Sequence, residues 1–210
     1  MKGKRTSKDP YREFKELIER KGDFILMNRL GFRNWLKRQE ISRDIKLVQN
    51  HHTYIPNYSH FKGDNHFALC ESMKRSHLKR GFSNIAQNIT TFPDGLIMIN
   101  RPLNTAPAGI KGANSKGICM EHVGNFDEGG DEMSKEHKKT ILWLNSELCF
   151  KFDLFPSTST IVYHHWFDLK TGKRRDGAGS TKSCPGTNFF GGNKVQDCEQ
   201  LFIPQVLKQV

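Results

Sequence analysis

The chain has 210 residues, of which 36% are hydrophobic and 26% are charged, and this composition is typical of one folded domain with a short appendage. It excludes a fully disordered chain and a collagen-like repeat, and no apolar run reaches the roughly 20 residues that a membrane-spanning helix needs. Lys and Arg number 33 against 22 Asp and Glu, so the formal net charge is +11.

The first segment, residues 1–44, is predicted to be a basic helical extension laid on the main domain. Residues 1–10 are typical of a frayed tail. In residues 11–20 the apolar positions fall on one face of a short helix, which Gly22 would end. Residues 32–38 predict a second helix.

The positive charge is concentrated in this part of the chain, since residues 1–46 contain 14 Lys and Arg against 7 Asp and Glu. Such an arm favours an anionic partner, which the sign of the charge leaves open as nucleic acid, a membrane surface or a bacterial wall. No apolar segment follows the basic start, so we expect a product made in the cytoplasm without a signal peptide.

The central segment, residues 45–195, alternates strand and helix patterns. It predicts an α/β fold with a single mixed sheet flanked by helices. The expected strands are residues 45–48, 85–92, 96–100, 118–126 and 158–163. The expected helices are residues 67–80 and a longer one that Ser134 caps and that runs to Phe152. Residues 196–210 are expected to form a tail that packs on the domain.

Two of the predicted strands run into a pair of histidines, His51 with His52 and His164 with His165. The C-terminal ends of strands are where α/β proteins tend to gather their chemistry. Cys184 follows the second pair by twenty residues, in a Cys-Pro-Gly turn. Two imidazoles and one thiolate suit Zn²⁺ and leave a fourth tetrahedral position for water. The alternative interpretation is polar surface or hydrogen-bonded packing for the histidines and an inert turn cysteine.

Four stretches occur in a fixed order between about residues 45 and 190. They are His51-His52-Thr53; residues 76–85 with the turn at 92–95 and Asn100-Arg101-Pro102; residues 112–126; and residues 161–164 with 182–186. In this order they resemble the zinc-dependent N-acetylmuramoyl-L-alanine amidases. This type 2 amidase family includes phage amidase lysozymes and peptidoglycan recognition proteins.

The resemblance implies a zinc ion on His51, His164 and Cys184. Within the first pair the register of the strand favours His51 over His52. Within the second pair the match to the family's strand favours His164 over His165. The reverse choice in either pair stays open at this point.

The resemblance also implies roles for residues around the metal. Lys182 falls where the family places a lysine that assists the tetrahedral intermediate. Gln87 falls where a Tyr or Glu normally assists the water, and an amide cannot take a proton. The general base is therefore open, with Glu121, His122 and His165 as substitutes.

Four further residues are expected to face the substrate: Thr53, Arg101, Asn114 and His165. An insertion at residues 167–181 is longer than the family's usual connection and rich in Lys and Arg. It is interpreted as a lid, as a loop that contacts the cell wall, or as a solvated basic loop.

The function that the resemblance implies is a peptidoglycan hydrolase that uses zinc-activated water to cleave the amide between N-acetylmuramic acid and L-alanine. We expect a phage or prophage lysin that acts on the bacterial wall after release or by non-classical export, with an autolysin or a toxin also open. The basic arm would add affinity for anionic wall polymers or lipopolysaccharide, and no stable nucleic-acid complex is expected. The alternatives are a non-catalytic peptidoglycan-binding protein of this fold and a basic nucleic-acid-binding protein.

Overall fold

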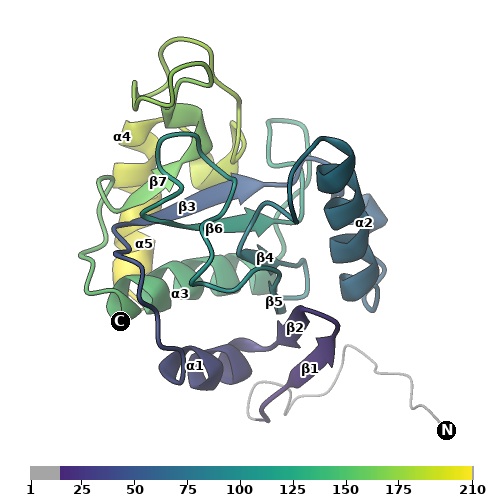
Figure 1. The fold of residues 1–210 in the computed structure, drawn as a ribbon. Coiled ribbons are helices and arrows are strands. Elements are labelled where there is room, and N and C mark those ends of the chain that lie inside the picture. Colours follow the sequence, from purple (N-terminus) through teal and green to yellow (C-terminus); the bar gives the residue numbers. More distant parts are fainter. Residues whose placement is uncertain (1–14, 210) are drawn as a thin grey trace, which may run out of the picture.

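A mixed seven-stranded sheet runs through residues 15–209, the part of the chain that the computed structural model describes (Figure 1). The strands are β1 Ile18–Lys21, β2 Phe24–Met27, β3 Leu47–His52, β4 Ile89–Thr91, β5 Ile97–Ile99, β6 Gly117–His122 and β7 Ile161–Tyr163. Across the sheet their order is β1-β2-β5-β4-β6-β3-β7. This confirms the predicted α/β class with a mixed sheet.

The four strands β4, β6, β3 and β7 are parallel, whereas β1, β2 and β5 are antiparallel to their neighbours. Parallel strands end at the same edge of a sheet, and side chains alternate between its two faces. The residues that follow β3, β6 and β7 therefore meet at one edge although they are far apart in the sequence.

Helices cover both faces of this sheet (Figure 1). They are α1 Arg29–Lys37, α2 His66–Lys79, α3 Lys135–Lys151, α4 Val195–Asp197 and α5 Ile203–Leu207, with a π-helical turn Cys198–Phe202 before α5. Buried side chains of α1, α3 and α5 share one hydrophobic cluster, and those of α2 share another with β2 and β5. No helix among residues 15–209 is long and apolar enough to cross a membrane.

The long helix α3 forms as predicted. Ser134 is its N-cap, and its hydroxyl accepts a hydrogen bond from the amide of His137 at 3.1 Å. Ile141, Leu144 and Leu148 are fully buried on the side that faces the sheet. The 3.6-residue period of these side chains therefore fixes which face of the helix packs.

The predicted helix over residues 11–20 is wrong where the structure describes it, because β1 begins at Ile18 and forms a hairpin with β2. The turn contains Gly22 with a φ of +56°, a conformation that favours glycine. All four residues of β2 are buried, and three of them, Ile25 to Met27, pair with β5, so strand pairing outweighs the weak helix propensity of a short segment. The second predicted helix is α1. The predictions for residues 1–14 lie outside the described part of the chain.

A buried chain of hydrogen bonds joins the sheet to α3. His122 Nε2 lies 3.0 Å from Asn50 Oδ1, an acceptor, so this nitrogen carries the proton and His122 Nδ1 accepts from the Thr91 hydroxyl at 2.8 Å. Thr91 Oγ1 in turn accepts from His137 Nε2 at 2.7 Å, and His137 Nδ1 accepts from the Tyr58 hydroxyl at 2.9 Å. Each histidine is therefore neutral, with one nitrogen donating and the other accepting.

Acid is expected to destabilise the fold through these two histidines. Burial lowers the pKa of His137 to about 3 and holds that of His122 well below its usual value. In the unfolded chain both titrate near pH 6.5, so the unfolded state binds more protons as the pH falls. The free energy of unfolding therefore has its full value above about pH 6.5. At pH 5, protonation of each histidine in the unfolded chain lowers it by about 2 kcal/mol.

The measurement is urea unfolding at pH 7.5 and pH 5, with a chelator present, for the wild type and for His137→Gln. The amide can replace the imidazole as a donor and acceptor but does not titrate. We expect the variant to lose about 2 kcal/mol less than the wild type between the two pH values. Equal losses in the two proteins would contradict this assignment.

Candidate metal centre and active-site pocket

One face of the sheet presents a row of polar side chains near the shared strand ends. His51 on β3 is in register with Glu121 on β6, and Glu121 is in register with Thr90 on β4. β7 pairs with β3 up to Tyr163, so His164 comes next to His51. The fold thereby brings His51, Glu121 and His164, from three separate segments, together at one edge of the sheet.

His51, His164 and Cys184 converge at the end of this row. His51 Nδ1 lies 3.2 Å from His164 Nδ1 and 3.5 Å from Cys184 Sγ, and the three ligand atoms all lie within 4.8 Å of one another. All three side chains are buried. Zn–N and Zn–S bonds of about 2.0 to 2.3 Å place tetrahedral ligand atoms about 3.3 to 3.8 Å apart. The donor atoms and their spacing therefore fit a zinc ion.

The electrostatics of this cluster also suit a metal. Burial holds the pKa of His51 well below its usual value and lowers that of His164 to about 4, and the Lys182 charge lowers both further. At neutral pH both imidazoles are thus uncharged, the form that binds metals. Burial raises the pKa of the Cys184 thiol, so metal binding would release its proton.

The geometry distinguishes the two members of each histidine pair. Successive residues of β3 face opposite sides, so His51 faces the cluster while His52 Nδ1 accepts from the Phe126 amide at 3.2 Å. His165 turns away from the cluster, and its Nδ1 donates to the backbone carbonyl of Lys182 at 2.7 Å. His51 and His164, and not His52 and His165, are therefore the histidines that the structure places together with Cys184.

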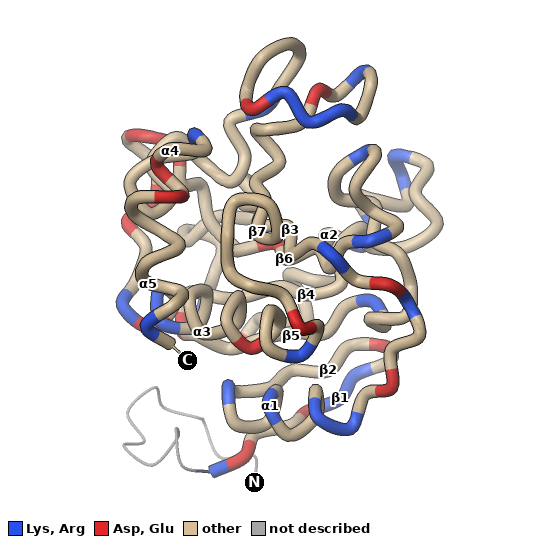
Figure 2. Tube along the Cα trace, turned by 90° about the vertical axis from the view of Figure 1, so that its left-hand side faces the viewer, with Lys and Arg blue, Asp and Glu red and all other residues tan. Residues whose placement is uncertain are grey.

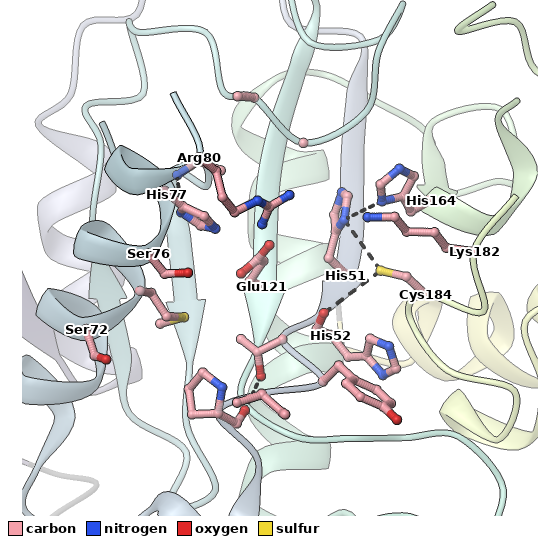
Figure 3. Close-up of a pocket in the computed structure, with 18 of the residues that line it drawn as sticks. His51, His52, Ser72, Ser76, His77, Arg80, Glu121, His164, Lys182 and Cys184 are labelled. Atoms are coloured by element: carbon pink, nitrogen blue, oxygen red, sulfur yellow. Dashed lines mark hydrogen bonds between the residues drawn. The ribbon is translucent and has the colours of Figure 1, made fainter. Parts of the chain in front are cut away.

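A pocket of about 740 Å³ opens beside the cluster, a size typical of ligand sites (Figure 3). Helix α2 forms one wall, and the loop that carries Cys184 borders the pocket on the side of the metal cluster. Its polar and charged lining residues are His51, His52, Thr53, Tyr54, His60, Ser72, Ser76, His77, Arg80, Glu121, His164, Lys182, Ser183 and Cys184.

Glu121 lies on the floor of this pocket, between the Arg80 side chain and His51 of the cluster (Figure 3). Burial raises the pKa of Glu121 to about 7, although the charges of Lys182 and Arg80 lower it in part. No hydrogen bond or ion pair within residues 15–209 engages its carboxylate. A free carboxyl group with this pKa can accept and return a proton at neutral pH.

Lys182 is exposed at the mouth of the pocket, and its ammonium group points toward His51 and His164 (Figure 3). It lies two residues before Cys184, in the same loop. A cation held there can stabilise negative charge that develops on a substrate oxygen near the cluster.

Gln87 lies behind the pocket wall and does not line the pocket. Its side chain is fully buried, and Nε2 donates to Thr90 Oγ1 at 2.9 Å. The chain enters β4 only at Ile89, and Ala86 takes the position that faces the pocket. His122 lies in the buried hydrogen-bond chain described above, so neither Gln87 nor His122 lines the pocket.

Three of the residues expected to contact the substrate, Arg101, Asn114 and His165, are also absent from the pocket lining. Arg101 donates to two loop carbonyls at 2.9 and 2.7 Å, and Asn114 Oδ1 accepts from two loop amides at 2.9 Å. Thr53 does line the pocket, where its hydroxyl accepts from a backbone amide at 3.0 Å. These polar side chains order the loops, a use that the sequence motifs do not distinguish from substrate binding.

The polar wall on α2 has only a weak signal in the sequence. Ser72, Ser76 and Arg80 recur at intervals of four residues, on the same side of α2 as Leu69 and Met73, which also line the pocket. A solvent-exposed helix face has the same pattern, so the spacing alone does not predict a pocket wall.

The basic insertion at residues 167–181 folds into an ordered loop that projects from the body of the protein (Figure 2). The Asp168 carboxylate accepts from three backbone amides at 2.7 to 3.1 Å, and these bonds lower its pKa to about 2. The Arg174 guanidinium stacks on Trp166 at 4.8 Å. Lys173 and Arg175 are exposed, so the loop offers positive charge to solvent.

The family model that matches the chain is that of N-acetylmuramoyl-L-alanine amidase, over residues 41–187. A search among curated protein sequences returned no match. A similar solved structure is the endolysin N-acetylmuramoyl-L-alanine amidase LysCS from Clostridium intestinale, with 20% identity, 70% of this chain and 78% of that chain covered, and a TM-score of 0.51.

Two further similar structures are of a Drosophila protein. Wild-type PGRP-LB has 18% identity, with 75% of this chain and 87% of that chain covered and a TM-score of 0.56. A point mutant of PGRP-LB in complex with tracheal cytotoxin has 19% identity, with 78% and 86% covered and a TM-score of 0.56. At these identities the likeness concerns the fold.

Proposed function

Because the chain belongs to the N-acetylmuramoyl-L-alanine amidase family, we propose that it hydrolyses the amide bond between N-acetylmuramic acid and L-alanine in peptidoglycan. The observation that carries this proposal is the convergence of His51, His164 and Cys184 at a pocket that also presents Glu121. Three buried donor atoms and a free carboxylate are what a metal-assisted hydrolase requires.

The metal in this proposal is zinc, held by Nδ1 of His51, Nδ1 of His164 and Sγ of Cys184. A bound zinc ion would supply a Lewis acid that polarises the scissile carbonyl and lowers the pKa of water. The chain's part is to hold three ligands in a dry site, since each of them is buried before any ion binds.

Glu121 is the general base of the proposal. One of its carboxylate oxygens takes a proton from the attacking water and then passes it to the amide nitrogen, which leaves as the free amine of L-alanine. Its position on the pocket floor and its raised pKa support this role. Gln87 has no part in the reaction, because its side chain is covered by the pocket wall.

Lys182 stabilises the negative charge on the carbonyl oxygen during the attack. The glycan and the stem peptide lie in the pocket between α2 and the Cys184 loop, which is the open side of the cluster. The wall of α2 with Ser72, Ser76 and Arg80 offers hydrogen bonds and positive charge to the substrate.

We further propose that the protein is a lysin that acts on the bacterial wall. The similarity to a clostridial endolysin supports this role. The net charge of +11 and the exposed Lys173 and Arg175 support additional affinity for anionic wall polymers or lipopolysaccharide.

Digestion of purified sacculi tests the proposed activity. We expect stem peptides with a free N-terminal L-alanine to appear with zinc present and to be absent with a chelator, as measured by mass spectrometry. Binding to sacculi without peptide release would contradict the enzyme and support a non-catalytic wall-binding protein. Salt-dependent binding to DNA together with no binding to sacculi would support the nucleic-acid alternative.

A further inference from the structure

Two buried polar atoms next to the metal cluster have no hydrogen-bond partner, His51 Nε2 and Gln49 Oε1. Both residues belong to β3 and lie two positions apart, so they occupy the same face of the sheet. A Cβ atom added to Gly109 would lie 2.6 Å from Gln49 Oε1 and 3.1 Å from His51 Nε2. The two atoms therefore flank one small region beneath the backbone of Gly109.

The side-chain amide of Gln49 is oriented by the hydrogen bond that its Nε2 atom makes. Gln49 Nε2 donates to the backbone carbonyl of Ala113 at 3.0 Å, which directs Oε1 to the opposite side. Gly117 crowds the same amide, since a Cβ there would lie 2.3 Å from Gln49 Nε2. The side chain is thus clamped between two glycines, with its oxygen on the side of His51.

A histidine that binds a metal through Nδ1 carries its proton on Nε2. A buried N–H without an acceptor is costly, and metal-ligating histidines almost always donate this proton to a neighbouring oxygen. His51 presents Nδ1 to His164 and Cys184, so its Nε2 is the nitrogen that needs an acceptor. Gln49 Oε1 is a buried acceptor without a hydrogen-bond partner that adjoins the same space next to Gly109.

We propose that Gln49 is a positioning residue for His51 and that its Oε1 accepts the hydrogen bond from His51 Nε2. A small rotation of the ring or one bridging water joins the two atoms. The bond holds the proton on Nε2, keeps Nδ1 free for the metal, and adds no charge to the site because the amide is neutral. This inference rests on the metal centre of the proposed function and is independent of the substrate.

Zinc affinity, measured by competition with a chelator, is the first test. Gln49→Met keeps the length of the side chain but has no acceptor, and we expect its affinity to fall about 10- to 100-fold. Gln49→Glu loses the donor to Ala113 but keeps an acceptor, so its affinity should exceed that of Gln49→Met. Gln87→Met is the matched control, because Gln87 is also buried with an unpaired Oε1 but lies behind the pocket wall.

The second test uses the metal-free protein. Nitrogen-15 NMR of the imidazole rings should show the His51 proton on Nε2 in the wild type and in Gln87→Met, and a mixture of tautomers in Gln49→Met. Equal zinc affinities of Gln49→Met and Gln87→Met would overturn the proposal. So would a His51 proton on Nδ1 in the wild type, a result that needs no variant to fold.

The wild type separates this inference from the proposed function. If the wild type binds no zinc, the metal centre itself is wrong and the role of Gln49 fails with it. If the wild type binds zinc and Gln49→Met binds it equally well, only the role of Gln49 is wrong.

Discussion

Replacing Cys184 by alanine is expected to abolish stoichiometric zinc binding and to lower the rate of stem-peptide release by at least about 10³-fold. Cys184 provides the one ligand of the cluster that becomes anionic, and its Sγ lies 3.5 Å from His51 Nδ1. Two neutral imidazoles remain in the variant, and they hold zinc far more weakly than a set with a thiolate. Zinc content and peptide release are measured on the same samples.

The matched control is Cys198→Ala. Cys198 is equally buried but lies on the π-helical turn before α5, outside the pocket lining. This variant should keep its zinc and its rate and lose about 1 kcal/mol of stability, because the same small volume is removed from the core. If Cys184→Ala and Cys198→Ala were equally active, the metal centre would not take part in the reaction.

The second large effect is expected from Glu121→Gln, which should lower the rate of hydrolysis by about 10²- to 10⁴-fold and leave zinc affinity unchanged. The amide has the shape of the carboxyl group but cannot accept a proton from water. Stability should not fall, because burial already disfavours the charged form of Glu121 and the amide is neutral. Single-turnover digestion and chelator competition separate the rate from the affinity.

Glu147→Gln serves as the control for this substitution. Glu147 lies on α3 and forms an ion pair with Arg33 at 2.5 Å, outside the residues that line the pocket. Removal of one surface ion pair changes stability by about 1 kcal/mol or less and should not change the rate. Full activity in Glu121→Gln would mean that another group takes the proton.

The His51, His164 and Cys184 cluster was expected from two signals together, the histidine pairs at the ends of two strands and the resemblance to type 2 amidases, which selected one histidine of each pair. His51 and His164 each follow an apolar run, and parallel strands bring such ends together whatever the loops between them do. The Cys184 turn adds the third ligand, a thiol. The long helix α3 was predictable for a similar reason, since Ser134 and an apolar stripe define its start and its buried face.

Other features depend on contacts that no local pattern encodes. The segment at Ile18 has helix-compatible spacing, but β2 offers it a strand partner that the sequence does not reveal. The directions of Gln87, Arg101 and Asn114 depend on where strands begin and how loops fold. A polar side chain that orders a loop and one that meets a substrate are alike until the fold is known.

The hydrogen-bond chain between Asn50 and α3 has a consequence for the opposite face of the sheet. Each group in the chain donates to the next one, so a shift of α3 by one turn would leave several buried donors and acceptors unpaired. Each unpaired group would cost about 1 to 3 kcal/mol of stability. Leucine and isoleucine contacts alone would tolerate such a slip far better. The hydrogen-bond chain thus fixes the position of α3 relative to β3. It acts through Asn50, the residue immediately before His51. The position of the His51 backbone is in this way fixed by hydrogen bonds on the opposite face of β3.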